Sequence, residues 1–233
     1  MLNLDFQYEV VRTKRERTAS VLIQENSVKI VVPNHLSQKR IDELIQKRSA
    51  WIRRKLKQSA EIKPAKEKEY VNGESFSYLG RNYRLRIIED AKSGEVKLRN
   101  GYFEVSLPKR VKADRRIETI RSMLSQWYAE YALERLTEKT DRYANILKVR
   151  PKSLKVRDYK SRWGSCSSVG DISYNWRIIM APHAVIDYVV VHELCHMIEH
   201  NHSPQYWKHV ERITPDWKEH RQWLRENGKQ LIV

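Results

Sequence analysis

Cysteine is scarce in this sequence, because Cys166 and Cys195 are the only two in 233 residues. Two cysteines exclude a disulfide-stabilised secreted scaffold, so a reducing cytoplasm is the predicted location; a single Cys166–Cys195 bridge is the less favoured alternative. Long apolar runs are also missing. No segment approaches the roughly 18 apolar residues of a membrane span, and the first residues hold no apolar stretch of signal-peptide length. We therefore expect a cytoplasmic protein without a membrane partner.

Acidic residues are outnumbered, because 45 Lys and Arg face 29 Asp and Glu, for a formal net charge of +16. The excess is uneven: residues 171–233 hold 7 basic and 8 acidic side chains, so it lies entirely in residues 1–170. A positive field of this size attracts anions, which makes nucleic acid, the ribosome or a phosphorylated small molecule candidate partners of this region. The alternative is a solvated basic surface that binds nothing.

Strand, proline and helix follow one another twice in the first part of the chain. The residue pattern predicts strands at 27–33 and 101–108, each closed by a proline, and helices at about 38–57 and 114–143. Trp51 and Trp127 lie at similar distances behind the two prolines. The segments between the first helix and the second strand are predicted to be a polar linker at 63–74 and a hairpin at 76–87.

The last third of the chain predicts two strands and a buried helix. "LKVRDY" (154–159) and "DISYNW" (171–176) alternate as strands do, with the turn "SCSSVGD" between them. A helix is predicted from Pro182 to about His200, and its apolar residues recur on several sides, which indicates a mostly buried element. Short helices are expected after Ser203 and Pro215. Together these elements predict an α+β fold.

The segment "VVVHELCH" (189–196) carries the chemistry. Residues four apart lie on the same face of a helix, so His192 and His196 can bind one metal ion, at Zn–N distances of about 2.0–2.1 Å. Glu193 faces the same pocket, where its carboxylate can take a proton from a metal-bound water. The alternative is a pair of surface histidines, but the apolar run before His192 favours a buried site that needs a partner for its polar atoms.

A third metal ligand is expected just beyond this motif, where Glu199, His200 and His202 are the candidates. On a continuous helix, His200 would lie about 12 Å from His192 along the axis, too far to share one ion. Asn201 can end the helix in a left-handed conformation and turn the chain back. This geometry ranks His202 first and Glu199 second.

The segments "SRWGSCSSVGDISYNWRIIMAPHAVIDYVVV" and "HELCHMIEHNHSPQYW" resemble the YgjP-like metallopeptidase domain family, which is related to the SprT-like and WLM zinc metalloprotease domains. The stretch "VVPNHLSQKRIDELIQKRSAWIRRKLK" resembles the N-terminal part of the same family. The resemblance implies His192, His196 and His202 as metal ligands and Glu193 as general base. It also implies a zincin-like catalytic half, in which a backing helix and a small sheet flank the active-site helix. We expect a basic α+β region at 1–112 and this catalytic domain at 113–233, or one continuous domain.

Candidate substrate contacts lie around the basic run 148–162 and the "WGSC" segment. On a strand, Lys155 and Arg157 share one face, which is expected to line the pocket entrance and suits a phosphate-bearing substrate. The strand beside the metal is expected to pair with an extended peptide. The full set of candidates is Lys155, Arg157, Arg162, Trp163, Ser165, Asn175 and Tyr206. Taken singly, Trp163 and Cys166 are better explained as core residues, Gly164 as a tight turn, and Cys195 as a small buried residue.

Three functions are consistent with this sequence. The preferred one is a zinc-dependent hydrolase, most simply a metallopeptidase acting on peptides or proteins through a water activated by Glu193. The second is a metal-dependent nucleoside triphosphate pyrophosphatase, with Mg²⁺ or Mn²⁺ as the ion and the basic strand holding phosphates. The third is a nucleic-acid- or ribosome-associated module whose metal is structural.

Overall fold

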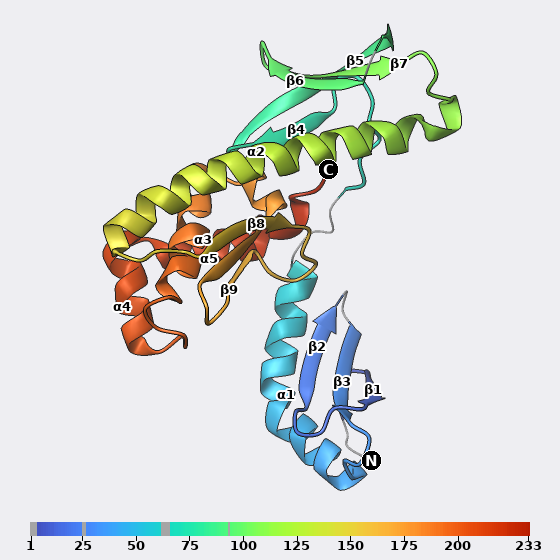
Figure 1. Ribbon diagram of the computed structural model, residues 1–233. Coiled ribbons are helices and arrows are strands. Elements are labelled where there is room, and N and C mark those ends of the chain that lie inside the picture. The colour runs from blue at the N-terminus through green and yellow to red at the C-terminus, as the bar shows by residue number, and fades with distance from the viewer. Residues whose placement is uncertain (1–3, 25–26, 62–65, 93) are drawn as a thin grey trace. The chain divides into compact units, whose positions relative to one another are not determined.

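The computed structural model describes residues 4–24, 27–61, 66–92 and 94–233 (Figure 1). The chain forms two compact units, Met1–Pro64 and Ala65–Val233. This division differs from the predicted boundary at residue 112. The reason is that the sheet formed by residues 75–108 shares its hydrophobic core with the helix that follows it, and therefore belongs to the second unit. The first residues of the predicted linker, 63–65, lie outside the described residues.

The N-terminal unit is a three-stranded sheet covered by one helix. Its elements are β1 (Tyr8–Thr13), β2 (Ser20–Gln24), β3 (Ser27–Pro33) and α1 (Gln38–Glu61). The central strand β3 runs parallel to β1 and antiparallel to β2. Alternate residues of β3 point to the helix, and their partners repeat at helical spacing on α1, as amphipathic elements require. The buried residues of this core are Val28, Ile30, Val32, Ile41, Ile45 and Ile52.

The second unit begins with a four-stranded sheet in the order β4-β5-β7-β6. Its strands are β4 (Ser75–Tyr78), β5 (Arg81–Ala91), β6 (Glu95–Arg99) and β7 (Tyr102–Pro108). The predicted hairpin is confirmed, because β4 and β5 pair antiparallel around Gly80. Strand β7 runs parallel to β5 and antiparallel to β6. The inner face of this sheet buries Phe76, Leu85, Phe103 and Val105.

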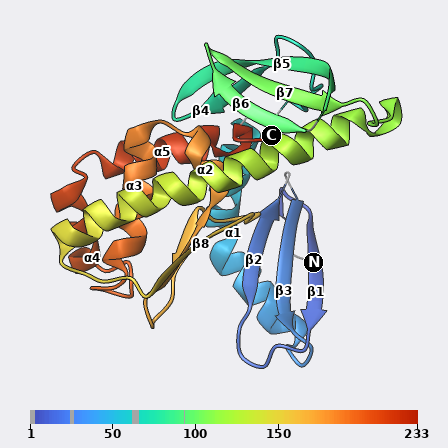
Figure 2. The same ribbon diagram turned by 45° about the horizontal axis from the view of Figure 1, so that its top comes forward.

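Helix α2 (Arg116–Leu147) follows a short 3-10 helix, η1 (Ala113–Arg115), and is longer than predicted at its C-terminal end. It ends where Lys148 takes a left-handed conformation, with φ 57°. Buried side chains occur along its whole length because the two halves of the helix cover different elements. Near the sheet, Phe103 packs edge-on against Trp127, with ring centroids 4.8 Å apart. The helix also contacts α3 and η2, and Figure 2 shows the sheet at one end of α2 and helices α3, α4 and α5 at the other.

The remaining elements build the second half of this unit. They are β8 (Ser153–Arg157), β9 (Gly164–Cys166), β10 (Asp171–Asn175), η2 (Trp176–Met180), α3 (His183–Cys195), α4 (Pro204–Ile213), α5 (Trp217–Asn227) and η3 (Gly228–Gln230). In the small sheet, β10 lies between β8 and β9, parallel to the former and antiparallel to the latter. Strand β9 therefore forms an edge. The predicted turn at 165–171 is only partly correct, since its first residues belong to this strand.

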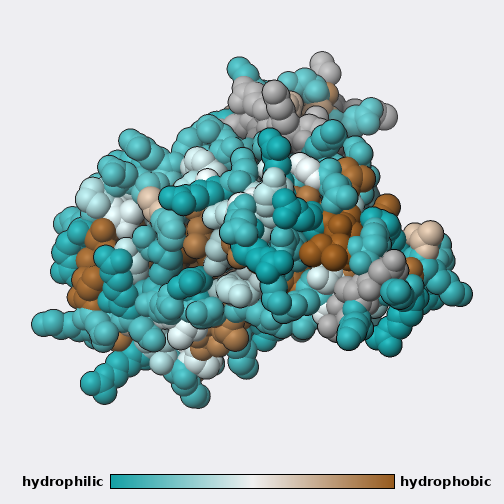
Figure 3. All heavy atoms as spheres, turned by 90° about the horizontal axis from the view of Figure 1, so that it is seen from above, coloured by the Kyte–Doolittle hydropathy of each residue, from teal (hydrophilic) through white to brown (hydrophobic). Residues whose placement is uncertain are grey.

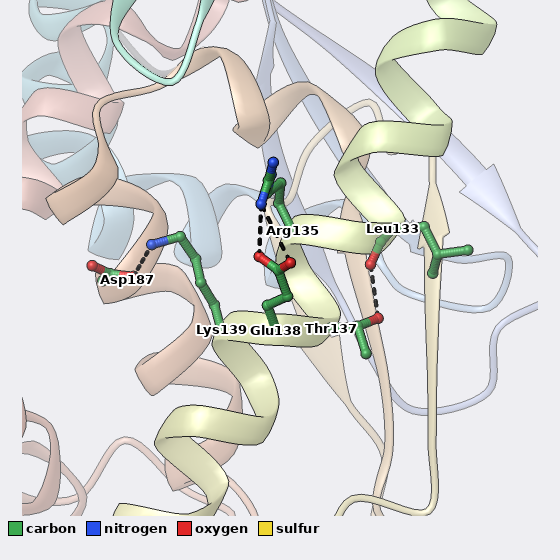
Figure 4. Close-up of polar contacts among 6 residues, drawn as sticks. All are labelled: Leu133, Arg135, Thr137, Glu138, Lys139 and Asp187. Carbon is green, nitrogen blue, oxygen red and sulfur yellow. Dashed lines mark hydrogen bonds and ion pairs between the residues drawn. The ribbon is translucent and has the colours of Figure 1, made fainter.

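Helix α3 is the central element of the second unit. It contacts α2, α4, α5 and β9, so apolar residues are buried on all its sides, as the sequence predicted. Helix α4 starts as predicted: Ser203 caps it by accepting a hydrogen bond from the Tyr206 amide at 3.2 Å, and Pro204 fills its first turn. A polar link ties α3 to α2, where Lys139 Nζ lies 2.5 Å from Asp187 Oδ1 (Figure 4).

The surface is mainly hydrophilic on the face shown in Figure 3, where hydrophobic residues form separate patches. None of the helices in the described ranges combines the length and the apolar character that crossing a membrane requires.

Candidate metal centre

Three histidines converge at the C-terminal end of α3. His192 lies in the helix, His196 is its C-cap residue, and His202 comes from the loop before α4. Potential ligand atoms of the three side chains all lie within 4.8 Å of one another. The Nε2 atoms of His192 and His202 are 3.2 Å apart, and the ring centroids of His196 and His202 are 4.7 Å apart. The structure thus brings together the three histidines that the sequence singled out.

The chain reaches this arrangement by ending α3 early. The helix stops at Cys195 and continues as a tight turn in which the amides of His196, Met197 and Ile198 each bond to the carbonyl three residues before. The predicted helix end at His200 was therefore wrong. The predicted left-handed Asn201 was wrong too, because non-glycine residues with positive φ in the described ranges are confined to Tyr70, Leu79, Asn100 and Lys148.

The donor set fits a tetrahedral zinc ion. Two nitrogens held at 2.0–2.1 Å from one tetrahedral ion lie about 3.3 Å apart, close to the separation of 3.2 Å between the His192 and His202 nitrogens. Metal binding also requires neutral imidazoles. Burial, and then the neighbouring His196 and His202, lower the pKa of His192 to about 3. Burial lowers the pKa values of His196 and His202 as well, so all three rings are neutral at pH 7.

Glu193 is buried beside the histidines, with 5% of its surface exposed. Burial raises the pKa of its carboxyl to about 8, and the charge of Arg162 opposes this shift. Strand β9 passes very close to this carboxylate: a Cβ atom at Gly164 would lie 2.5 Å from Glu193 Oε1. Gly164 was interpreted from the sequence as a tight turn. It lies instead in a strand, and glycine is needed there so that the backbone can approach Glu193.

Aromatic side chains hold the histidines in place. Tyr206 is fully buried and stacks on the His196 ring at 4.7 Å, and its hydroxyl donates a hydrogen bond of 2.8 Å to the His192 carbonyl. This position does not fit the predicted substrate contact for Tyr206, because the hydroxyl is used inside the core. Trp207 stacks between His202 and Trp217, at 5.6 Å and 4.0 Å. Trp207 and Trp217 therefore form an aromatic stack beside the histidine cluster.

An open hollow of about 520 Å³ lies over the histidines and Glu193. Arg162, Ser165 and Cys166 are among its other lining residues, so two of the predicted substrate contacts lie at this opening. Ser165 Oγ is 3.2 Å from the Tyr159 hydroxyl. Burial raises the pKa of the Cys166 thiol to about 11, which keeps it protonated. Cys166 and Cys195 are both free thiols.

The remaining predicted contacts lie elsewhere. Lys155 and Arg157 belong to β8, which β10 separates from β9, and they do not line the hollow. Asn175 is buried and holds the segment before β9: its Nδ2 donates to the carbonyls of Tyr159 and Arg162, at 2.8 and 3.3 Å. A Cβ atom at Gly228 would lie 2.7 Å from Trp163 Cζ2, so the indole packs against the backbone after α5. Asn175 and Trp163 therefore position the site and lie outside its opening. Neither role was visible in the sequence, because both depend on contacts with distant segments.

Comparison with known proteins supports the sequence resemblance. A model of the family described as YgjP-like, metallopeptidase domain, matches residues 17–227. No curated protein matches the chain. Among solved structures, the crystal structure of the metallopeptidase zymogen of Pyrococcus abyssi abylysin is 20% identical, over 42% of this chain and 99% of that one, with a TM-score of 0.38.

Proposed function

Because the chain belongs to the YgjP-like family, whose matching region is a metallopeptidase domain, we propose that it is a zinc-dependent peptidase. The observation that carries this proposal is the convergence of His192, His196 and His202 next to the buried carboxyl of Glu193. Three protein ligands leave one position of a tetrahedral ion for water, as catalytic zinc sites require. The proposed architecture around the site is zincin-like, with α2 behind α3 and the edge strand β9 beside it. A cytoplasmic location is part of this proposal, because two cysteines are too few for a disulfide framework.

Zinc fits this donor set better than Mg²⁺ or Mn²⁺, because imidazole nitrogens suit zinc whereas the harder ions prefer oxygen ligands. When bound, zinc supplies a Lewis acid that polarises the scissile carbonyl and makes water more acidic. His192 and His196 come from one helical segment, and His202 closes the set from the following loop. The stacked rings of Tyr206 and Trp207 fix the orientation of these ligands, which is the usual task of residues packed around a metal site.

Glu193 acts as the general base in this proposal. It accepts a proton from the attacking water and returns that proton to the leaving nitrogen. Its pKa of about 8 in the metal-free protein keeps the carboxyl largely protonated at pH 7. With a divalent cation held by the three histidines, the Glu193 carboxyl would be ionised and could act as the base.

The substrate is proposed to bind along β9. This strand pairs with β10 on one side and forms the edge of its sheet on the other. An extended peptide can add to such an edge through main-chain hydrogen bonds. Ser165 and Cys166 of β9 line the hollow above Glu193, so a peptide on this edge would present its backbone to the site.

Replacement of Glu193 by Gln tests the chemistry. We expect Glu193→Gln to retain its zinc and to lose turnover by about 10³-fold or more, because the amide cannot accept the proton. Zinc content is measured by elemental analysis, and hydrolysis is followed with an unstructured protein substrate. His202→Ala is the matched ligand variant and should lose zinc as well as turnover. Full activity of Glu193→Gln would contradict the proposal.

A second candidate function keeps the metal and changes the bond. Arg162 lines the hollow over the histidines, and a guanidinium there also suits a phosphate-bearing substrate such as a nucleoside triphosphate. A parallel assay with nucleoside triphosphates, with zinc, Mg²⁺ and Mn²⁺ as alternative ions, separates the two. Release of pyrophosphate without cleavage of any peptide would favour the phosphohydrolase.

A further inference from the structure

A second hollow, of about 830 Å³, lies in the same unit and takes no part in the function proposed so far. It is formed by part of the segment 67–70, part of α2, the segment 158–163, Asn175 and Arg177, and the residues at the end of α5 and beyond; we call it the basic cavity. Seven Lys and Arg line it, against two acidic residues. A concave surface with this imbalance concentrates its positive field, which favours an anionic ligand.

The two acidic residues do not neutralise this charge. Asp158 is engaged by Arg177 in a bidentate ion pair, with distances of 2.8 and 3.1 Å. Arg121 lies 3.7 Å from Glu118. Across the described ranges, no carboxylate, that of Glu67 included, lies within ion-pair distance of four further cavity cations, Lys160, Arg162, Arg225 and Lys229. These four side chains can therefore form ion pairs with an anionic ligand. All four side chains are exposed.

Arg162 connects the basic cavity to the metal centre, because it lines both hollows. The backbone around it is held on both sides. Asn175 Nδ2 binds the Tyr159 and Arg162 carbonyls, and Trp163 packs against Gly228. A ligand that spans both hollows thus meets a segment that is already in place, which reduces the entropy lost on binding.

We propose that the basic cavity binds acidic residues of the peptide substrate, and that the enzyme prefers peptides with Asp or Glu a few residues away from the scissile bond. The proposal rests on the proposed peptidase function and adds a substrate class to it. Arginine and lysine form charge-assisted hydrogen bonds with carboxylates, and arginine can do so with both oxygens at once. The volume of the cavity lies in the range of ligand pockets and holds more than one such side chain.

Matched peptides test this preference. One cleavable core is extended by four Glu, four Gln or four Lys, and kcat/KM is measured at low and high salt. For wild type we expect the Glu peptide to be cleaved about tenfold faster than the Gln peptide at low salt, with the advantage shrinking as salt increases. The Arg225→Gln/Lys229→Gln double variant should lose this advantage, so that the Glu and Gln peptides are cleaved with similar kcat/KM.

A second double variant controls for charge. Lys109→Gln/Arg110→Gln removes the same number of cations from an exposed segment outside the cavity, and it should keep the preference for Glu. Loss of the preference in both variants would mean a general charge effect and would overturn the cavity assignment. Thermal melts of both variants report on folding.

Binding to Glu193→Gln separates this inference from the proposed function. Titration of that protein with the Glu and Gln peptides, and with inorganic triphosphate, measures recognition without turnover. Failure of wild type to cleave any peptide would contradict the proposed peptidase function. Equal binding of the Glu and Gln peptides, with equal cleavage, would contradict the acidic preference without contradicting the proposed peptidase function. Tighter binding of triphosphate than of the Glu peptide, abolished by Arg225→Gln/Lys229→Gln, would assign the cavity to phosphates and overturn the proposal.

Discussion

The N-terminal unit and the first half of the second unit share a strand arrangement. The spatial order is β1-β3-β2 in the first sheet and β5-β7-β6 in the second, where β4 is an additional strand. In both, the third of these strands in sequence ends at a proline and a long helix follows. The registers agree at two points, although β5 has an irregularity between Ile88 and Ala91 that β1 lacks. Pro33 and Pro108 each pair with the last residue of the parallel strand, and the residue two positions earlier pairs with the first residue of the antiparallel strand. The repeated strand–proline–helix pattern of the sequence thus corresponds to one structural motif used twice.

The two copies differ in what their helices support. Helix α1 has 24 residues, and its buried residues face its own sheet. Helix α2 has 32 residues; its first half covers the sheet, and its second half packs against α3, which carries the metal motif. The motif forms a complete layer by itself in one unit, and in the other its helix also supports the candidate metal centre. The difference lies in the length of the helix and in the residues on its extension.

The largest expected effects come from the cores of the two helices. Leu136 on the extension of α2 and Ile45 on α1 are both fully buried. We expect Leu136→Ala and Ile45→Ala each to lower the free energy of unfolding of its own unit by about 2–5 kcal/mol, because each leaves a cavity. Only Leu136→Ala should also weaken zinc retention. Denaturant unfolding and elemental analysis measure the two effects. Zinc loss in Ile45→Ala would contradict the inference that only α2, and not α1, supports the metal centre.

The pH dependence should also distinguish the units. In the metal-free protein the pKa of Glu193 is about 8, raised from 4.5 by burial. Its stabilising contribution is therefore complete below pH 4.5 and is lost as pH rises through 8. His192, with its pKa lowered to about 3, acts in the opposite sense, and its contribution is lost as pH falls from 6.5 through 3.

The Glu193→Gln variant separates the contribution of the Glu193 carboxyl to the pH dependence of stability from that of His192. At pH 8, without metal, this variant should be more stable than wild type by about 4 kcal/mol, and the gain should vanish near pH 4. Chemical denaturation at several pH values, in the presence of a chelator, provides the measurement. The N-terminal unit has no buried ionisable side chain among its described residues, so its unfolding should be the same in both proteins. A constant difference between pH 4 and pH 8 would contradict the assigned pKa.

Substitutions of two glycines, Gly164 beside Glu193 and Gly101 before β7, distinguish the metal centre from the four-stranded sheet. Gly164→Ala places a methyl group against the Glu193 carboxylate. Since a displacement of about 1 Å in a reacting group can cost about 10²-fold in rate, we expect a loss of activity of this size with zinc retained. Gly101→Ala is the control, because its φ of 81° is strained for alanine but its Cβ meets no neighbour. It should lose about 1 kcal/mol of stability and keep full activity. Activity and thermal stability are measured for both variants. Full activity of Gly164→Ala would contradict the role of β9 in positioning Glu193.

The smallest effects concern ion pairs. Lys139 and Asp187 join α2 to α3, and their side chains are 15% and 22% exposed. In the N-terminal unit, Lys29 and Glu9 are 43% and 61% exposed. Solvent screens the second pair, so Lys139→Met should cost about 1 kcal/mol or more and Lys29→Met about 0–0.5 kcal/mol. Double-mutant cycles with Asp187→Asn and Glu9→Gln measure each coupling, and equal values would contradict this ranking.

Much of the secondary structure was predictable because its signals are local. The strand before Pro33, the hairpin at Gly80 and the start of α4 at Ser203 follow from residues that are neighbours in sequence. The short strands β1, β2 and β6 were missed. A strand of three to six residues gives a weak pattern, and its existence depends on partners that lie elsewhere in the chain. The end of α3 was placed too late, since the helix gives way after Cys195 to the tight turn that precedes His202.

The sequence by itself determined the metal motif, since the helical period places His192 and His196 on one face whatever surrounds them. It also determined that the positive charge precedes this motif. Only the tertiary structure decided that Gly164 touches Glu193, that Asn175 fixes the segment leading to β9, and that Arg162 stands between two hollows. Contacts of the first kind follow from bond geometry within a single helix. Those of the second kind arise from the packing of β9, α3 and α5, whose relative positions are set by the shared hydrophobic core and by no local rule.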